Sequence, residues 1–190
     1  HVTQLFTPRW VVEFLLHNSL GSFWRELHPD SALAFAWLVE PPETRQVERK
    51  RCCEIRVIDP ACGTMNFGLV AGELLHAMYR EEMDRAGGTG WPAEPSVRRD
   101  REIAQSILRN NIFGTDIDPL AIDLARAALQ IKFRLDAQPM NLSCGDALFP
   151  KNTAASGAEF DVVVTNPPYL SSRNLQNDRV GSLKRAYPRA

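Results

Sequence analysis

Short apolar segments rich in β-branched residues alternate along this chain with longer segments of helical period, and this alternation limits the possible folds more than any other feature. Apolar side chains spaced three or four residues apart predict helices after Gly63, around Ile107 and after Pro119. Strands that alternate with helices form a mostly parallel sheet with helices on both faces. The sequence therefore predicts an α/β fold of this kind. Its strands are expected over residues 55–58, 112–115, 141–143 and 160–165.

A short helical segment is expected before the first strand. Thr7 and Pro8 suit the start of a helix, and Gly21 suits its end. A second short helix is expected over residues 31–39. We therefore divide the chain into an N-terminal helical segment, an α/β core and a polar tail without periodicity, which are residues 1–51, 52–170 and 171–190.

Composition excludes several classes of protein. The 190 residues suffice for one ordinary globular domain, and no apolar run is long enough to cross a membrane. The four cysteines have neither the spacing of metal ligands nor the density of a disulfide scaffold, so we expect no metal and a reducing, cytoplasmic setting. The net charge of −1 does not indicate a strong binder of duplex DNA. Because the chain begins with His1 rather than Met, we expect it to be a piece of a longer protein.

The residues at the strand ends carry the functional signal, because ligands of open α/β sheets bind beyond the carboxyl ends of the strands. The first strand runs into small residues at 59–64, which let a ligand approach the backbone and the following helix N-terminus. The second ends in Asp116, whose carboxylate can accept hydrogen bonds from ribose hydroxyls. The third ends in Asp146, whose carboxylate can accept a hydrogen bond from an adenine amine. Taken alone, residues 59–64 can also be an ordinary tight turn, and a turn is the favoured interpretation of Asp146. The alternative for Asp116 is a helix cap, but Asp118 already has that role.

The fourth strand ends in Asn166-Pro167-Pro168-Tyr169, which is the most specific feature of the sequence. Pro167 fixes its own φ and holds Asn166 extended. The Asn166 side-chain carbonyl and the Pro167 main-chain carbonyl can then face one point, with the ring of Tyr169 beside them. This arrangement suits a planar base that carries an amino group.

The motifs together resemble the gamma-class adenine-N6 DNA methyltransferases of restriction–modification and phage-defence systems, which use S-adenosylmethionine. The resemblance rests on Asp59-Pro60-Ala61-Cys62-Gly63, on Asn166-Pro167-Pro168-Tyr169 and on Phe6-Thr7-Pro8 upstream of both. It covers nearly the whole chain up to Tyr169. It implies a Rossmann-like, class I methyltransferase fold and a target-recognition domain after residue 190, through which the parent protein would bind double-stranded DNA.

The resemblance also assigns the site residues. The residues expected to hold the methionine and ribose parts of the cofactor are Phe6, Thr7, Pro8, Asp59, Pro60, Ala61, Cys62, Gly63 and Asp116. Those expected at its adenine ring are Ile117, Asp146 and Ala147. Those expected to hold the flipped target adenine are Asn166, Pro167, Pro168 and Tyr169.

This chain departs from the family at Met65, where the family usually has a second glycine. If that position has a positive φ, Met65 destabilises the cofactor loop.

Other functions share part of this pattern. Methyltransferases acting on a guanine amine of ribosomal RNA or on a glutamine amide of a protein also use an Asn-Pro-Pro-Tyr group, and a non-catalytic DNA-binding scaffold can keep the fold. The upstream Phe6-Thr7-Pro8 and the Asp-Pro-Ala-Cys-Gly form favour DNA adenine. Intact Asn166 and Tyr169 argue against a scaffold. A nicotinamide dehydrogenase would leave the Asn-Pro-Pro-Tyr group unexplained. The fragment by itself is expected to be inactive and to bind DNA weakly, without sequence preference.

Overall fold

The computed structural model describes five stretches of the chain, which are residues 7–39, 48–136, 139–149, 157–167 and 177–187. Four strands form one all-parallel sheet in the order β3-β2-β1-β4. Val57 in β1 is paired with Ile112 in β2 on one side and with Val162 in β4 on the other. The strands are β1 (Val57–Asp59), β2 (Ile112–Asp116), β3 (Asn141–Cys144) and β4 (Val162–Val163).

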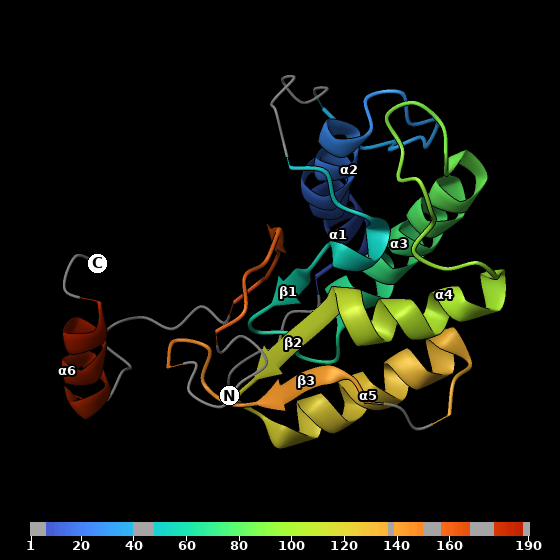
Figure 1. The fold of residues 1–190 in the computed structure, drawn as a ribbon. Coiled ribbons are helices and arrows are strands. Elements are labelled where there is room, and N and C mark those ends of the chain that lie inside the picture. The colour runs from blue at the N-terminus through green and yellow to red at the C-terminus, as the bar shows by residue number, and fades with distance from the viewer. Residues whose placement is uncertain (1–6, 40–47, 137–138, 150–156, 168–176, 188–190) are drawn as a thin grey trace.

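The helices follow the alternation that the sequence predicts (Figure 1). Asp118 accepts a hydrogen bond from the main chain of Leu120 and Pro119 opens the helix, as the predicted cap requires. The helices and helical turns are α1 (Arg9–Leu16), η1 (His17–Gly21), α2 (Ser22–Leu27), η2 (Cys52–Glu54), α3 (Asn66–Arg85), α4 (Asp100–Ser106), η3 (Ile107–Asn111), α5 (Pro119–Phe133) and α6 (Asn177–Ala186). The Rossmann-like α/β fold is confirmed.

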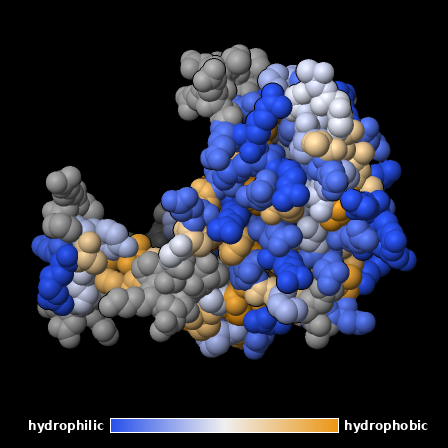
Figure 2. Space-filling view, in the orientation of Figure 1, coloured by the Kyte–Doolittle hydropathy of each residue, from blue (hydrophilic) through white to orange (hydrophobic). Residues whose placement is uncertain are grey.

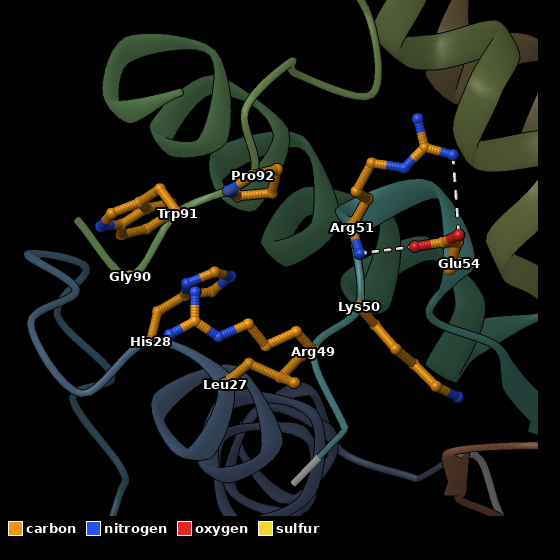
Figure 3. A pocket seen from close by; sticks show the side chains of 9 residues that line it. All are labelled: Leu27, His28, Arg49, Lys50, Arg51, Glu54, Gly90, Trp91 and Pro92. Atoms are coloured by element: carbon orange, nitrogen blue, oxygen red, sulfur yellow. Dashed lines mark hydrogen bonds and ion pairs between the residues drawn. The ribbon is translucent and has the colours of Figure 1, made fainter. Parts of the chain in front are cut away.

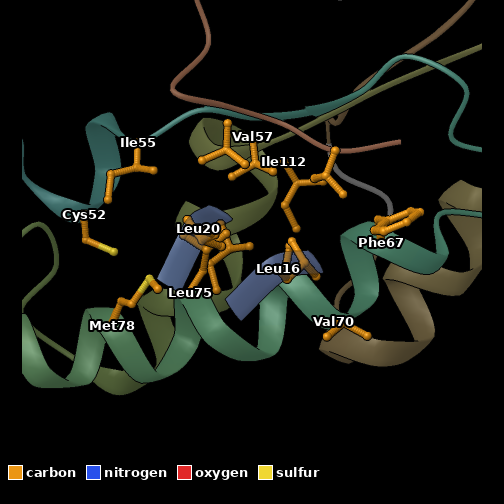
Figure 4. Packing of buried hydrophobic residues seen from close by; sticks show 14 of the residues in the cluster. Leu16, Leu20, Cys52, Ile55, Val57, Phe67, Val70, Leu75, Met78 and Ile112 are labelled. Carbon is orange, nitrogen blue, oxygen red and sulfur yellow. The ribbon is translucent and has the colours of Figure 1, made fainter. Parts of the chain in front are cut away.

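One face of the sheet carries the main core. The helices α3 and α5 contact each other as well as the sheet, so both lie on this face. Leu16 and Leu20 from the N-terminal segment pack between the strands and Leu75 of α3 (Figure 4). The other face bears Val163, which is 62% exposed, and a second layer of helices on that face stays a prediction.

The N-terminal segment differs from its prediction in two places. Gly21 does not end the first helix, because the helical path continues through the π-helical turn η1 into α2. A Cβ at Gly21 would lie 2.8 Å from Cδ1 of Phe35, so this glycine provides space for a ring rather than a stop signal. The expected helix over residues 31–39 is also wrong, since the described backbone there is not helical.

Side chains of neighbouring helices explain the non-helical backbone of residues 31–39. Glu81 Oε1 accepts the N–H of Ala32 at 2.5 Å, and His17 Nδ1 accepts the N–H of Trp37 at 3.1 Å. These tertiary hydrogen bonds replace the internal bonds of a helix.

Two consecutive buried carboxylates on α3 organise the irregular segments. Glu81 accepts the indole N–H of Trp24 at 2.9 Å. Glu82, with no exposed surface, accepts the main-chain N–H groups of Cys52 and Ser96, both at 2.6 Å. Hydrogen bonds of this kind hold polar loops against an otherwise apolar helix face.

The last two elements differ in length from their predictions. The fourth strand is paired only at Val162 and Val163, although the apolar sequence extends from 160 to 165. The polar tail contains the helix α6, which the absence of periodicity did not predict. The N-terminal helices and the α/β part share one core, and the division at residues 51 and 170 stays a prediction.

Candidate active site at the carboxyl edge of the sheet

The carboxyl ends of the four strands meet at one edge, because the strands are parallel and adjacent. The arrows of β1, β2 and β3 point toward the same side of the molecule (Figure 1). Asp59 and Asp116 are the last residues of their strands, Asp146 lies two residues after β3, and Asn166 lies three residues after β4. The structure therefore brings the four predicted strand-end groups to one edge.

The loop after β1 is held in a tight turn by its neighbours. Asp59 Oδ1 accepts the N–H of Ala61 at 3.1 Å, and the carbonyl of Thr115 in β2 accepts the N–H of Cys62 at 3.0 Å. Gly63 has φ +51°, and its N–H donates to Asp116 Oδ2 at 2.8 Å. The loop is thus fixed against the end of β2 before any ligand is considered.

Met65 has φ 72° and ψ 35°, so the condition for a destabilising effect of this residue, a positive φ, is met. A left-handed conformation at a residue other than glycine costs about 1–2 kcal/mol. The side chain is 1% exposed and fills the space over Gly68 and Gly114, where an added Cβ would meet it at 2.5 Å and 3.0 Å. Burial of the methionine therefore offsets the backbone strain at this loop.

Asp59 is a buried carboxyl group at the centre of the edge. It is 3% exposed, and its Oδ2 has no hydrogen-bond partner. Burial raises the pKa of Asp59 to about 6; the Ala61 N–H and the nearby Thr165 hydroxyl oppose this rise, and the charge of Asp116 adds to it. Thr165 Oγ1 is itself buried and makes no hydrogen bond within normal limits, so this hydroxyl and Asp59 Oδ2 are two unsatisfied polar atoms.

Cys62 lies next to these carboxylates and is an unsuitable nucleophile. Its burial raises the pKa of the thiol to about 12, and the charges of Asp59 and Asp116 add to the effect. A thiol must ionise to attack. The site therefore has an electrostatic preference for a cationic ligand and contains a protonated thiol.

Asp116 and Ile117 lie at the end of β2, next to the loop that follows β1. Asp116 Oδ1 accepts the N–H of Asp118 at 3.0 Å, which leaves further lone pairs on a half-buried carboxylate. Ile117 is 61% exposed, and an exposed apolar side chain at this position can pack on a ring.

Asp146 forms the turn that was the alternative interpretation of this position. Its Oδ1 accepts the N–H of Leu148 at 3.0 Å, and its carbonyl accepts the N–H of Phe149 at 2.9 Å. The preceding Gly145 donates to the carbonyl of Asp116 at 2.8 Å, so this turn is fixed beside β2. Asp146 and Ala147 are both half-buried there.

Asn166 lies beside the start of the N-terminal segment. Its Nδ2 donates to Thr7 Oγ1 at 3.0 Å, and Nδ2 of Asn66 donates to the Thr7 carbonyl at 2.9 Å. Thr7 therefore contacts both Asn166, three residues after β4, and the first residue of α3. Pro167 is exposed, and Phe6, Pro168 and Tyr169 lie outside the described residues.

Sequence reasoning did not identify Asn66 or Thr165 as part of this edge. Asn66 directly follows the cofactor loop, and an amide at the first position of a helix could have indicated a contact with another segment. The sequence pattern places Thr165 only at the end of an apolar strand, although a hydroxyl at the end of such a run is itself a signal.

A separate cavity of about 180 Å³ lies at the other end of β1. It is enclosed by the end of α2, residues 49–51, Glu54 of η2 and the loop at 90–92 (Figure 3). His28 stacks on Trp91 with ring centroids 3.9 Å apart, and burial lowers the pKa of this imidazole. No predicted site residue lines this cavity, so it is distinct from the carboxyl edge.

The described residues also bear on whether the chain contacts a membrane or holds a metal ion. Hydrophilic residues dominate the face shown in Figure 2, and apolar residues form small groups among them. The described helices include none long and apolar enough to cross a membrane. Within the same residues, no group of three or more His, Cys, Asp or Glu side chains could hold a metal ion.

Comparison with known proteins gives two kinds of match. Residues 110–190 match the Eco57I restriction-modification methylase family. The chain is 37% identical over 146 residues to the adenine-specific methyltransferase BrxX of Escherichia coli O9:H4 (strain HS), and 36% identical over 150 residues to the adenine-specific methyltransferase PglX of Lacticaseibacillus casei (strain Zhang). Each match includes 70% of this chain and 11% of the relative, so the chain spans about a tenth of the length of these proteins. The resemblance to adenine-specific restriction–modification methyltransferases is confirmed.

Proposed function

We propose that this chain is the cofactor-binding and methyl-transferring part of a DNA adenine-N6 methyltransferase of a restriction–modification or phage-defence system. The observation that carries the proposal is the position of Asn166, which lies at the same sheet edge as the loop 59–63 and Asp116. The relatives named as adenine-specific methyltransferases support adenine as the target.

The residues at the edge fit S-adenosylmethionine as the cofactor. This molecule carries a sulfonium and an ammonium group, and the edge presents three carboxyl groups, from Asp59, Asp116 and Asp146. Asp59 Oδ2 is buried without a hydrogen bond, and an ammonium group would satisfy it. Asp116 would hold the ribose hydroxyls, and the exposed Ile117 would cover the adenine ring.

When bound, S-adenosylmethionine supplies a methyl group that is open to attack by a nitrogen. The adenine amine is a poor nucleophile, because its lone pair is delocalised into the ring. Asn166 Oδ1 and the Pro167 carbonyl would accept the two amine hydrogens and stabilise the charge that develops on nitrogen. Tyr169 would stack on the flipped base, which cannot be reached inside a duplex. The transfer would break the sulfur–methyl bond as the carbon–N6 bond forms and would release S-adenosylhomocysteine, and the proton that N6 loses would pass to solvent.

The proposed transfer needs no covalent intermediate on the protein. The Cys62 thiol is held protonated, and the reaction requires positioning of two bound groups rather than a protein nucleophile. Residues 1–51 would then complete the cofactor site, 52–170 would form the catalytic core, and 171–190 would lead to a domain that recognises the DNA sequence. All four cysteines are free, which supports the proposed cytoplasmic setting.

The test measures transfer of a labelled methyl group by the full-length protein to two kinds of DNA duplex. The duplexes have the same surrounding sequence, and one contains adenine where the other does not. Asn166→Ala should reduce the rate by roughly 10²–10³, the effect of removing a comparable group that stabilises developing charge, while cofactor affinity stays within about twofold. Tyr169→Ala should weaken base capture by about 1–3 kcal/mol, and Tyr169→Phe should retain stacking. Methylation of adenine at the parental rate by Asn166→Ala would refute the proposed mechanism.

A further inference from the structure

Thr7 links two segments of the site that are far apart in sequence. Its Oγ1 accepts a hydrogen bond from Asn166 Nδ2, and the two residues are 159 positions apart. Its carbonyl accepts a hydrogen bond from Asn66, the first residue of α3. Thr7 therefore joins the helix that follows the loop after β1 to Asn166, three residues beyond the end of β4.

The direction of the Thr7–Asn166 hydrogen bond determines which end of the amide remains available. An asparagine side chain has a donor NH₂ and an acceptor oxygen. Because Thr7 Oγ1 accepts from Nδ2, the Oδ1 atom is the end that can accept from another group. If the amide rotated by 180°, its NH₂ would face the adenine amine, and two donors would meet without an acceptor.

We infer that Thr7 is a positioning residue, which holds the Asn166 amide with Oδ1 directed to the target amine. The inference rests on the proposed function and extends it, because the family resemblance assigns Thr7 to the methionine part of the cofactor. Thr7 and Asn166 are each half-buried, so water competes less with this hydrogen bond than at a fully exposed site. Asn66 fixes the Thr7 backbone, so the hydroxyl is presented from a held position.

Single-turnover methylation by the full-length protein, with the cofactor saturating, tests the inference. Thr7→Val keeps the shape of the side chain and removes the hydroxyl, and we expect the rate to fall by about tenfold, which corresponds to one net hydrogen bond. Thr7→Ser keeps the hydroxyl and should restore most of the rate. Thr89→Val is the matched control, because Thr89 is exposed in the loop after α3 and remote from the edge.

A double-mutant cycle separates positioning from cofactor binding. If Thr7 acts through Asn166, Thr7→Val should cause no further loss in an Asn166→Ala background, since the amide that it orients is gone. Cofactor affinity measured by calorimetry should change by less than about twofold in Thr7→Val. A weakened affinity together with an additive loss of rate would show that Thr7 acts on the cofactor, and the inference would be wrong.

A measurement on this chain alone distinguishes failure of the inference from failure of the proposed function. The side-chain amide signals of Asn166 in an NMR spectrum should shift in Thr7→Val and remain near their original positions in Thr7→Ser. Unchanged signals in Thr7→Val would overturn the inference, whatever the activity. If the full-length protein does not methylate adenine while the signals behave as expected, the proposed function fails and the orientation of the amide by Thr7 is supported.

Discussion

Replacing the buried Asp59 by asparagine should change how the stability of this chain depends on pH. Burial raises the pKa of Asp59 from 3.8 to about 6 in the folded chain. The folded state therefore retains the Asp59 proton over a range in which the unfolded chain has lost it. Stability contributed by this group is fully present below about pH 4 and is lost as the pH rises through about 6.

The size of the effect follows from the pKa difference. A difference of about two units corresponds to about 3 kcal/mol, because one unit is worth 1.36 kcal/mol. At pH 7.5, ionised Asp59 should thus lower the free energy of unfolding by about 3 kcal/mol compared with its protonated form. The Asp59→Asn variant would keep an acceptor for the Ala61 N–H and would carry no charge at this position.

Urea unfolding between pH 4 and pH 8, followed by circular dichroism, measures the difference. The free energy of unfolding of Asp59→Asn minus that of the parent should increase by about 2.5 kcal/mol from pH 4 to pH 7.5, because the unfolded chain has already lost part of the Asp59 proton at pH 4. Subtraction removes the groups that both chains share, and Asp123→Asn, at an exposed position, controls for the loss of one negative charge. A difference that stays constant over this range would show that the carboxyl group of Asp59 is well solvated, and the electrostatic description of the site would be wrong.

Three further predictions concern other parts of the fold and site. Met65→Gly should remove about 1–2 kcal/mol of backbone strain but lose about 2–5 kcal/mol of buried packing. Urea unfolding should therefore show a net loss of stability of about 1–3 kcal/mol. A stabilised variant would show that the strain exceeds the packing energy. Glu82→Ala should leave the N–H groups of Cys52 and Ser96 without an acceptor, and this should reduce the free energy of unfolding by about 2–5 kcal/mol. A loss below about 1 kcal/mol would mean that water replaces the carboxylate as the acceptor. Asp116→Ala should weaken S-adenosylmethionine binding by about 1–3 kcal/mol in calorimetry, and unchanged affinity would remove Asp116 from the ribose site.

The sheet edge could be predicted from sequence because each strand end is a local signal. A β-branched run followed by Asp59 or by Asp116 specifies both the strand and the residue at its end. Parallel strands then place these ends at one edge, whatever the details of packing. The chemistry-bearing residues 59–63 and 166 could be found in the same way.

The irregular N-terminal connections could not be predicted, because distant side chains determine their conformation. Residues 31–39 have an apolar, alanine-containing sequence that suits a helix, yet Glu81 and His17 accept their N–H groups. Propensity is worth a few tenths of a kcal/mol per residue, and a hydrogen bond to a buried carboxylate is worth about 1.5–3 kcal/mol. Tertiary contacts therefore override the local preference at this segment.

The position of Thr7 depends on how α1 packs against the core. Burial of apolar side chains contributes most of the free energy of this packing. Arg9 contacts Glu73 of α3 at 2.6 Å, and Lys132 of α5 contacts the same carboxylate, but the Arg9 side chain is 63% exposed. Exposed ion pairs contribute about 0–1 kcal/mol, whereas full burial of one side chain such as Val12 or Leu16 contributes about 1.5–3 kcal/mol. The core contacts of α1 therefore decide where its first residues lie, and through Thr7 they decide the geometry at Asn166.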